Sequence, residues 1–320
     1  MRSTVGCTVK KRISVLLALA VCAIAHPRLL AQNKALAEIP FMVEDGRTII
    51  PVTAGGAVLR LVLDSGHATD GILLYRQGKI DTSAIGQSRE VAVAGAGGGS
   101  NSRALLFESA RFSVAGIDFA NQRAVILIGS DLMDSRNDGV IGYSLLGHYA
   151  VELDYDRRVM TLYDSGTFAP KSGWESLDIY FKNNRIPWID IAIATKDEPP
   201  VRLSTYIDFA SREALELLTR DVNRFQLPAE TKSYYLGRGL SGDIFGQEAT
   251  IARMRIGSQQ LTDVRVAIAA ASVRSRQDNA DGIVGNDALR RFNVIFDYAH
   301  AKLHIRPNSS FSEPFTGTRR

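Results

Sequence analysis

The sequence predicts an all-β chain built as two equivalent lobes related by a pseudo-twofold axis. A shift of 143 residues places Asp138-Gly139-Val140-Ile141-Gly142 on Asp281-Gly282-Ile283-Val284-Gly285. The same shift places Val151 to Tyr155 on Val294 to Tyr298. With a slip of one residue, Asp64 falls on Asp208, and both acids end an apolar stretch. Three ordered landmarks at matched spacing indicate an internal duplication, with lobes over residues 38–164 and 173–308.

Asp64 and Asp208 are the candidate catalytic residues. Leu61, Val62 and Leu63 are typical of a buried strand, and a carboxylate buried at the end of that strand is costly unless other groups compensate for it. The nearby Gly66 allows a tight turn. Since a duplication sets equivalent residues on either side of the lobe interface, we expect the two carboxylates to face each other.

These residues resemble the bilobal, pepsin-like aspartic proteases, and in particular the bacterial retropepsin-like branch, the aspartyl protease family proteins. Each lobe of that family carries apolar-apolar-Asp-Thr/Ser-Gly, a glycine-tipped hairpin, and apolar-apolar-Gly before a short helix and a final hairpin. The chain has these motifs twice, as Leu63-Asp64-Ser65-Gly66, Gly95 to Gly99 and Val140-Ile141-Gly142, and as Ile207-Asp208, Gly237 to Gly242 and Ile283-Val284-Gly285. The resemblance implies the pepsin-like acid protease fold and peptide hydrolysis by a water activated between the two aspartates.

The resemblance also assigns roles to residues around the aspartates. It implies that the two active loops are supported by Ser65, Gly66 and Ser211. It implies flaps that close over a peptide or protein substrate, formed by Gly95, Gly97, Gly98, Gly99 and Gly239. The alternative for the first glycine run is a flexible hairpin tip with no role. The family's first flap carries a tyrosine, and this chain has none between Arg89 and Leu105.

The second motif departs from the family pattern. Phe209 stands where a hydroxyl would cross-link the two active loops, and Ala210 stands where glycine would make the turn. His67 adds either a cation beside the pair or a histidine hydrogen-bonded at the lobe edge. Three hypotheses follow: an exported aspartic endopeptidase, a catalytically impaired peptide-binding relative in the cell envelope, or a structural partner with a vestigial cleft.

The first 31 residues are expected to be a signal peptide. Lys10-Lys11-Arg12 precedes thirteen mostly apolar residues, Ile13 to Ala25, fewer than the roughly 20 that a membrane-spanning helix needs. Cleavage would follow Ala25, Ala31 or Ala37, and an uncleaved anchor is the alternative. The mature protein is then expected in the periplasm or outside the cell, with no stable membrane span.

Composition narrows the classes of partner and cofactor. Both cysteines, Cys7 and Cys22, lie in the expected signal, so the mature chain can form no disulfide or thiolate metal site. Residues 1–25 hold four basic residues and no acid, and their removal takes the net charge from +4 to zero. Nothing then favours nucleic acid as a partner. No cofactor or metal site is expected, because the five histidines show no metal-ligand spacing beyond His300 and His304 at the end of a hairpin. The sequence does not indicate an oligomeric state.

Four further predictions concern local structure. Short helices are expected over residues 144–149 and over Ser211 to Asn223, where Ser211 would be the N-cap and Leu215, Leu218 and Val222 would share one face. Glycine and proline between residues 164 and 173 indicate the linker between the lobes. Residues 309–320 are rich in Ser, Thr and Gly and are expected to form a disordered tail.

Overall fold

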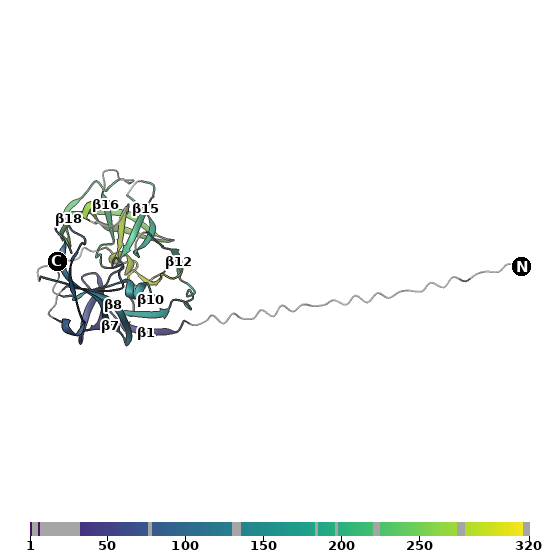
Figure 1. Cartoon of the computed structure of the whole chain (residues 1–320). Helices are drawn as coiled ribbons and strands as arrows, with labels where there is room; N and C mark the ends of the chain where they lie inside the picture. Colours follow the sequence, from purple (N-terminus) through teal and green to yellow (C-terminus); the bar gives the residue numbers. More distant parts are fainter. Residues whose placement is uncertain are drawn as a thin grey trace. The chain divides into compact units, whose positions relative to one another are not determined.

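Two eight-stranded β-sheets of the same topology form the frame of this computed structural model (Figure 1). The structure describes Met1, Gly6 and residues 33–75, 79–129, 136–182, 185–195, 198–219, 225–273 and 279–315. Apart from Met1 and Gly6, the signal peptide predicted over residues 1–31 lies outside the described residues. Asn33–Arg320 form one compact unit.

The first sheet has the strand order β2-β3-β4-β9-β5-β8-β7-β6. Its strands in chain order are β2 (Met42–Glu44), β3 (Arg47–Ala54), β4 (Ala57–Leu63), β5 (Gly71–Leu74), β6 (Arg89–Val93), β7 (Ser102–Val114), β8 (Ile117–Leu127) and β9 (Gly139–Ile141). Two antiparallel hairpins, β3–β4 and β6–β7, lie on either side of the central strands. The β6–β7 hairpin is the one that the sequence predicts with its tip at Gly95 to Gly99.

The second sheet repeats the first strand for strand, in the order β13-β14-β15-β20-β16-β19-β18-β17. Its strands in chain order are β13 (Tyr180–Phe181), β14 (Pro187–Ala194), β15 (Val201–Asp208), β16 (Leu215–Thr219), β17 (Lys232–Gly239), β18 (Gly242–Ile256), β19 (Gln259–Ala270) and β20 (Gly282–Gly285). Even the additional pairing is shared, since β3 pairs with β7 and β14 pairs with β18. The predicted duplication and two-lobed β fold are confirmed.

A third sheet joins the lobes in the order β1-β11-β10-β21-β22-β12. Its strands are β1 (Ala35–Pro40), β10 (Tyr149–Asp154), β11 (Val159–Asp164), β12 (Glu175–Asp178), β21 (Phe292–Asp297) and β22 (Lys302–Pro307). At its centre β10 pairs antiparallel with β21, its equivalent from the other lobe. The lobe bounds drawn from the sequence stay a prediction.

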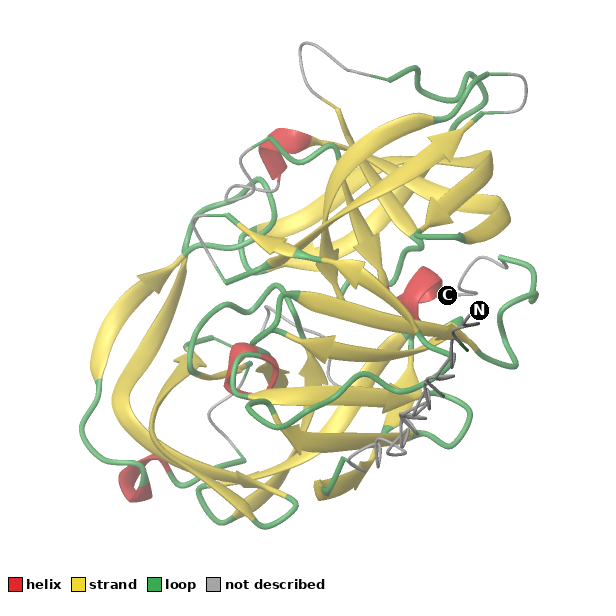
Figure 2. Ribbon diagram, turned by 90° about the vertical axis from the view of Figure 1, so that its right-hand side faces the viewer, coloured by secondary structure: helices red, strands yellow, loops and turns green. Residues whose placement is uncertain are grey.

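Helix is scarce in the described chain, as Figure 2 shows. Its elements are α1 (Tyr143–Leu146), α2 (Asn286–Leu289) and the 3-10 turns η1 (Thr82–Ala84) and η3 (Ala271–Val273). α1 and α2 follow the two Asp-Gly-x-x-Gly repeats, and α1 corresponds to the short helix predicted over residues 144–149.

The glycines of the duplicated motif let one strand pass between two others. β9 lies between β4 and β5, pairing parallel with β4 and antiparallel with β5. A Cβ at Gly139 would clash with the backbone of β5, and one at Gly142 would clash with the carbonyl oxygen of Asp64. In the second lobe, Gly282 and Gly285 pack as closely against the backbone of residues 213–216. The repeats are therefore explained by close backbone approach.

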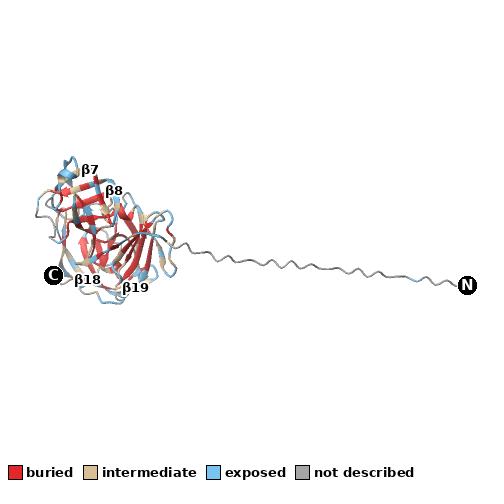
Figure 3. Ribbon diagram, turned by 90° about the horizontal axis from the view of Figure 1, so that it is seen from below, coloured by how far each residue is buried: buried red, intermediate tan, exposed pale blue. Residues whose placement is uncertain are grey.

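Most buried apolar side chains of the two lobes form one continuous core, with smaller clusters beside it. In Figure 3 the buried residues follow the strands of the sheets. Leu63 and Ile207, which precede the two aspartates, are both fully buried in this core. Packing across the lobe interface therefore fixes the backbone on which each aspartate is carried.

The prediction of a helix over Ser211 to Asn223 is wrong for residues 211–219. Residues 220–223 lie outside the described residues. Leu215–Thr219 form strand β16, which pairs parallel with β19 and antiparallel with β20. Leu215, Leu217 and Leu218 are all buried, so both faces of the strand are covered. A strand covered on both faces does not alternate between polar and apolar residues. Its leucines can therefore also fit the spacing of a helix, which is why the sequence predicted one.

The predicted disordered tail does not hold for residues 309–315. Arg291, fully buried, donates hydrogen bonds to the carbonyl oxygens of Ser310, Glu313 and Pro314. Its guanidinium also lies 3.6 Å from the centre of the Phe315 ring. These contacts satisfy a buried cation and hold the segment on the second lobe. Residues 316–320 lie outside the described residues.

Candidate active site

Asp64 follows β4, and the backbone around it is fixed by β9. Its backbone N–H donates to the carbonyl oxygen of Ile141 at 2.9 Å. Its carboxylate oxygen Oδ1 accepts hydrogen bonds from the backbone N–H groups of Gly66 at 2.8 Å and His67 at 3.1 Å. Two such donors both orient the carboxylate and stabilise its charged form.

Asp208, the last residue of β15, is held in the same way. Its Oδ1 accepts hydrogen bonds from the backbone N–H groups of Ala210 at 2.8 Å and Ser211 at 3.3 Å. The carbonyl oxygen of Ser211 accepts in turn from Asn286 N at 2.8 Å. Ala210, at the position of Gly66 in the first motif, therefore keeps the backbone donor, and the second carboxylate is oriented like the first.

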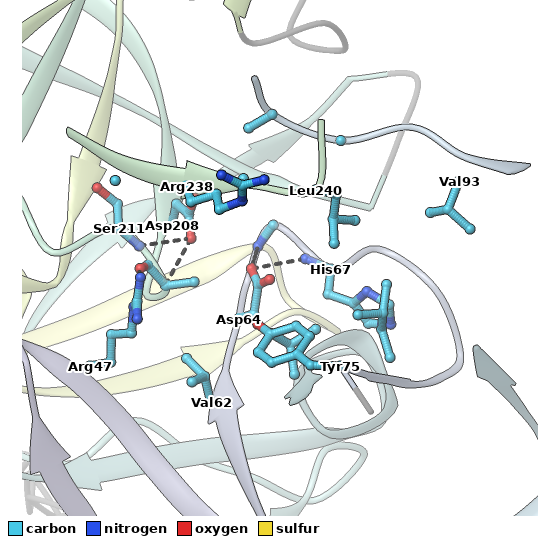
Figure 4. A pocket seen from close by; sticks show the side chains of 18 of the residues that line it. Arg47, Val62, Asp64, His67, Tyr75, Val93, Asp208, Ser211, Arg238 and Leu240 are labelled. Atoms are coloured by element: carbon cyan, nitrogen blue, oxygen red, sulfur yellow. Dashed lines mark hydrogen bonds between the residues drawn. The ribbon is translucent and has the colours of Figure 1, made fainter. Parts of the chain in front are cut away.

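Both carboxylates face Gly66. A Cβ built on this glycine would lie 3.0 Å from Asp64 Oδ1 and 3.7 Å from both Cγ and Oδ2 of Asp208. Figure 4 shows the two aspartates beside each other in the pocket. A larger residue at position 66 would crowd both acids, which gives a physical reason for glycine in the first motif.

The shared environment keeps a proton on the pair. Burial, followed by the charge of Asp208, raises the pKa of Asp64 to about 8, against the smaller opposing effects of the backbone donors and the Arg47 charge. Two carboxylates this close cannot both ionise readily, so they titrate as a coupled pair. The pair therefore holds one proton at neutral pH.

The Ser65 side chain links both active loops. Its Oγ donates to the carbonyl oxygen of Ile207 at 2.8 Å and accepts from the backbone N–H of Phe209 at 3.1 Å. Phe209 has no hydroxyl to return this link. Its ring is fully buried and packs edge-on against Phe296, with ring centres 5.2 Å apart. The hydrogen bonds from the Ser65 side chain to the second loop are therefore present, whereas the second loop packs an aromatic ring where an equivalent hydroxyl would stand.

His67 is not a cation near the aspartates at neutral pH. Burial lowers the pKa of its imidazole to about 4, so the ring is neutral above that value. Its Nε2 is buried and has no hydrogen-bond partner. The expectation of a charged ring is therefore corrected, whereas the hydrogen-bonded histidine at the lobe edge stays a prediction. The residue contributes its backbone N–H to Asp64.

The cavity above the aspartates has a volume of about 350 Å³. It includes two residues that sequence reasoning missed. Arg47, the first residue of β3, donates from Nε to the carbonyl oxygen of Ala210 at 3.2 Å. Tyr75 directly follows β5 and lines the cavity. The β6–β7 hairpin, where the resemblance places a tyrosine, carries none. Neither residue belongs to a repeated motif, so the duplication gave no signal for them.

Two hairpins meet over this cavity. The first hairpin is β6–β7 and the second hairpin is β17–β18. Gly99 N donates to Ser241 O at 2.5 Å, and Ser241 N donates to Ala96 O at 2.9 Å. Ser102 Oγ donates to Leu240 O at 2.6 Å. The two tips therefore hold each other directly, and each contributes to the lining of the cavity.

The glycines predicted as flap residues divide into three groups. Gly95 and Gly239 line the cavity, and a Cβ at either would also meet the opposite hairpin, 2.5 Å from the Leu240 side chain and 2.1 Å from the Ala96 carbonyl oxygen respectively. Gly97 and Gly99 approach the backbone of the second hairpin so closely that a Cβ would lie 2.5 Å from Ser241. Gly98 has no atom within 4 Å of the position a Cβ would take. Glycine is thus required where the hairpins cross, rather than along the whole tip.

No group of three or more His, Cys, Asp or Glu side chains in the described part of the chain is placed to hold a metal ion. No helix within the described ranges is long and apolar enough to cross a membrane.

The architecture is that of the pepsin-like aspartic proteinases, a nearly all-β chain folded in two lobes. Among solved structures, the crystal structure of the aspartic proteinase from Irpex lacteus is similar to this chain, with a TM-score of 0.56. The similarity covers 85% of this chain and 97% of that chain at 12% sequence identity, and it concerns the fold. No family model and no curated protein sequence matches the chain. The bacterial retropepsin-like branch stays a prediction.

We predict that Ser65→Ala destabilises the lobe interface. The substitution leaves the buried N–H of Phe209 without its acceptor, which costs about 1 to 3 kcal/mol in free energy of unfolding. Ser65→Thr keeps the hydroxyl and is the control, expected to lose less. Chemical denaturation measures both, and an alanine variant as stable as the wild type would contradict the cross-link.

We predict that Asp64→Asn changes how stability depends on pH. The pKa of Asp64 is raised to about 8 in the folded protein, so the wild type's stabilisation is complete below about pH 4 and is lost as pH rises toward 8. Asparagine does not titrate. The melting temperature of the variant relative to wild type should therefore rise from pH 4 to pH 8, measured by scanning calorimetry.

The control for this measurement is Asp118→Asn, at an exposed position. Its melting temperature relative to wild type should stay constant over the same range. A constant difference for Asp64→Asn would show that the folded protein holds no extra proton at this site.

Proposed function

We propose that the protein is an aspartic endopeptidase that hydrolyses peptide bonds with a water held between Asp64 and Asp208. The observation that carries this proposal is the pair of carboxylates facing one glycine, each oriented by two backbone N–H groups beneath a cavity. The pepsin-like fold supports the same chemistry, because its two lobes bring both carboxylates to one cavity, which the two hairpins also line. The pair needs no cofactor for this reaction.

One carboxylate of the pair is ionised and the other is protonated, and the reaction uses both. The ionised carboxylate takes a proton from the water as its oxygen attacks the peptide carbonyl carbon. The protonated carboxyl donates a hydrogen bond to the carbonyl oxygen, where negative charge develops. When the carbon–nitrogen bond breaks, the proton taken from water passes to the departing amine. Burial and the repulsion between the two carboxylates raise the pKa of Asp64, so the pair keeps its shared proton to higher pH. We therefore infer activity that extends to near-neutral pH.

A second candidate is a peptide-binding relative with impaired catalysis. The observation that favours it is the buried Phe209 ring, which removes one of the two hydroxyl links between the active loops. Against it stands the retained orientation of Asp208, which depends on backbone donors that the substitution leaves in place. A misplacement of about 1 Å costs on the order of a hundredfold in rate, so the two candidates differ in measurable activity.

We predict that wild-type protein cleaves a mixture of denatured proteins and that Asp64→Asn abolishes this cleavage. Digestion from pH 3 to 9, followed by mass spectrometry of the products, measures both. Cleavage should decline as pH rises through about 8, where the pair loses its shared proton. Equal cleavage by the variant would exclude this pair as the catalyst. Peptide binding without cleavage by the wild type would select the second candidate.

We also propose export to the periplasm or the cell exterior, on the basis of residues 1–31. The structure makes a mature start at His26 or Gln32 more consistent with the fold than one at Glu38. The Asn33 side chain accepts from Ala169 N and donates to Ala169 O, each at 2.8 Å, and β1 pairs with β11. A start at Glu38 would remove these contacts and half of β1.

We predict that N-terminal sequencing of the protein recovered outside the cytoplasm begins at or before Asn33. A start at Glu38 would contradict the structural role of Asn33. Protein that retains Met1 would contradict cleavage of the signal.

A further inference from the structure

The turn that leads into β3 lies against the second active loop, residues 208–211. Asn286, the fully buried first residue of α2, joins the two segments. Its backbone N–H donates to the carbonyl oxygen of Ser211 at 2.8 Å, and its side-chain Nδ2 donates to the carbonyl oxygen of Gly46 at 2.7 Å. The backbone from which the Arg47 side chain starts is therefore held beside the loop that carries Asp208.

The Arg47 side chain makes a direct contact with this loop. Its Nε donates to the carbonyl oxygen of Ala210 at 3.2 Å, while the N–H of Ala210 donates to Asp208 Oδ1 at 2.8 Å. Figure 4 shows the Arg47 side chain extending toward Asp208 and Ser211. Ala210 is thus bonded to the first lobe through its carbonyl group and to the carboxylate through its N–H, so a movement of this residue would disturb both.

The duplication shows that this contact is particular to one lobe. The register of β3 with β4, continued by two residues, places Arg47 opposite Asp64. The register of β14 with β15, continued in the same way, places Ile186 opposite Asp208. Ile186 is buried in an apolar cluster with Trp188. An aliphatic side chain cannot donate a hydrogen bond, so this contact runs only from the first lobe to the second active loop.

This direction matters because the second active loop cannot bond back to the first lobe through Phe209. Ser65 contacts the second lobe at residues 207 and 209, on either side of Asp208. Arg47 adds a contact at residue 210, whose N–H orients the Asp208 carboxylate. The loop without a hydroxyl of its own is therefore held by two side chains of the first lobe.

We propose that Arg47 is a positioning residue, whose N–H fixes Ala210 and thereby the Asp208 carboxylate, and that it compensates for the hydroxyl link that Phe209 does not make. This inference rests on the proposed endopeptidase function and adds a residue to the same site. Arg47 acts through the loop, whereas Asp64 and Asp208 perform the chemistry.

The test compares two uncharged substitutions, Arg47→Gln and Arg47→Met. Glutamine places an N–H donor at the position along the side chain where arginine has Nε, and methionine places a methyl group there. Since both variants lack the positive charge, they differ in the hydrogen bond to Ala210. The substrate is one peptide that the wild type cleaves, and kcat and KM are measured for each protein.

Arg47→Met should lower kcat roughly a hundredfold with little change in KM, as expected when a catalytic group is misplaced by about 1 Å. Arg47→Gln should keep kcat within a few-fold of wild type. Equal kcat values for the two variants would overturn the proposal. A rise in KM at unchanged kcat would also overturn it, because Arg47 would then bind the substrate instead.

The matched control is Arg202→Met. Arg202 is an exposed arginine on β15, the strand that ends at Asp208, and it pairs with Asp190. The substitution removes the same side chain from the same lobe interface strand without touching the active loop, and kcat should stay unchanged. A fall in kcat as large as that of Arg47→Met would overturn the assignment.

Hydrogen–deuterium exchange measured by mass spectrometry tests the same contact without catalysis. Backbone N–H groups of residues 208–211 should exchange faster in Arg47→Met than in wild type and Arg47→Gln. Those of residues 64–67 should not, because β9 holds the backbone at Asp64. Unchanged exchange at residues 208–211, or an equal increase in both loops, would overturn the proposal.

This readout separates failure of the inference from failure of the proposed function. If the wild type cleaves nothing, the endopeptidase proposal fails, and exchange at residues 208–211 still decides whether Arg47 holds the loop. Faster exchange in Arg47→Met alone would then support Arg47 as the residue that positions Asp208 in a binding protein.

Discussion

The constraint on which the site depends is the burial of two carboxylates at one interface. Each acid is costly there, and the protein offsets that cost with backbone N–H donors from its own loop and with a shared proton. Backbone donors tolerate sequence change, because any residue except proline supplies one. Ala210 can therefore stand where the first motif has Gly66 and still donate its backbone N–H to Asp208. Phe209 stands where the first motif has Ser65, and its side chain has no hydroxyl to make the equivalent hydrogen bonds.

The duplicated repeats predicted the fold because they mark a steric requirement. Glycine at positions 139, 142, 282 and 285 lets a strand pass between two others, and this need leaves a signature in the sequence. The strand at Leu215–Thr219 left no comparable signature, since its burial on both faces erased the alternation that separates strand from helix. Pairing with β19 and β20 decided its conformation.

The aspartates and their supporting loops were predictable for the same reason, whereas other parts of the site were not. Arg47 reaches Ala210 across a sequence separation of 163 residues, outside any repeat. The neutral state of His67 follows from the burial of its ring, which composition does not indicate. Contacts between the hairpin tips likewise depend on how the lobes approach each other. Sequence patterns predict where a carboxylate stands on its own strand, but the surroundings that set its charge come from distant segments.

The pairing of β10 with β21 has a consequence for how such a chain arose and folds. A polypeptide that ended after the first lobe would leave the inner edge of β10 open, with its backbone groups ready to bind another strand. A second copy offers the same edge in antiparallel orientation, so the isolated half would be expected to assemble as a symmetric dimer. Joining both halves in one chain fixes their ratio and removes the concentration dependence of that assembly. It also frees each half to change alone, and the second motif has Phe209 and Ala210 where the first has Ser65 and Gly66.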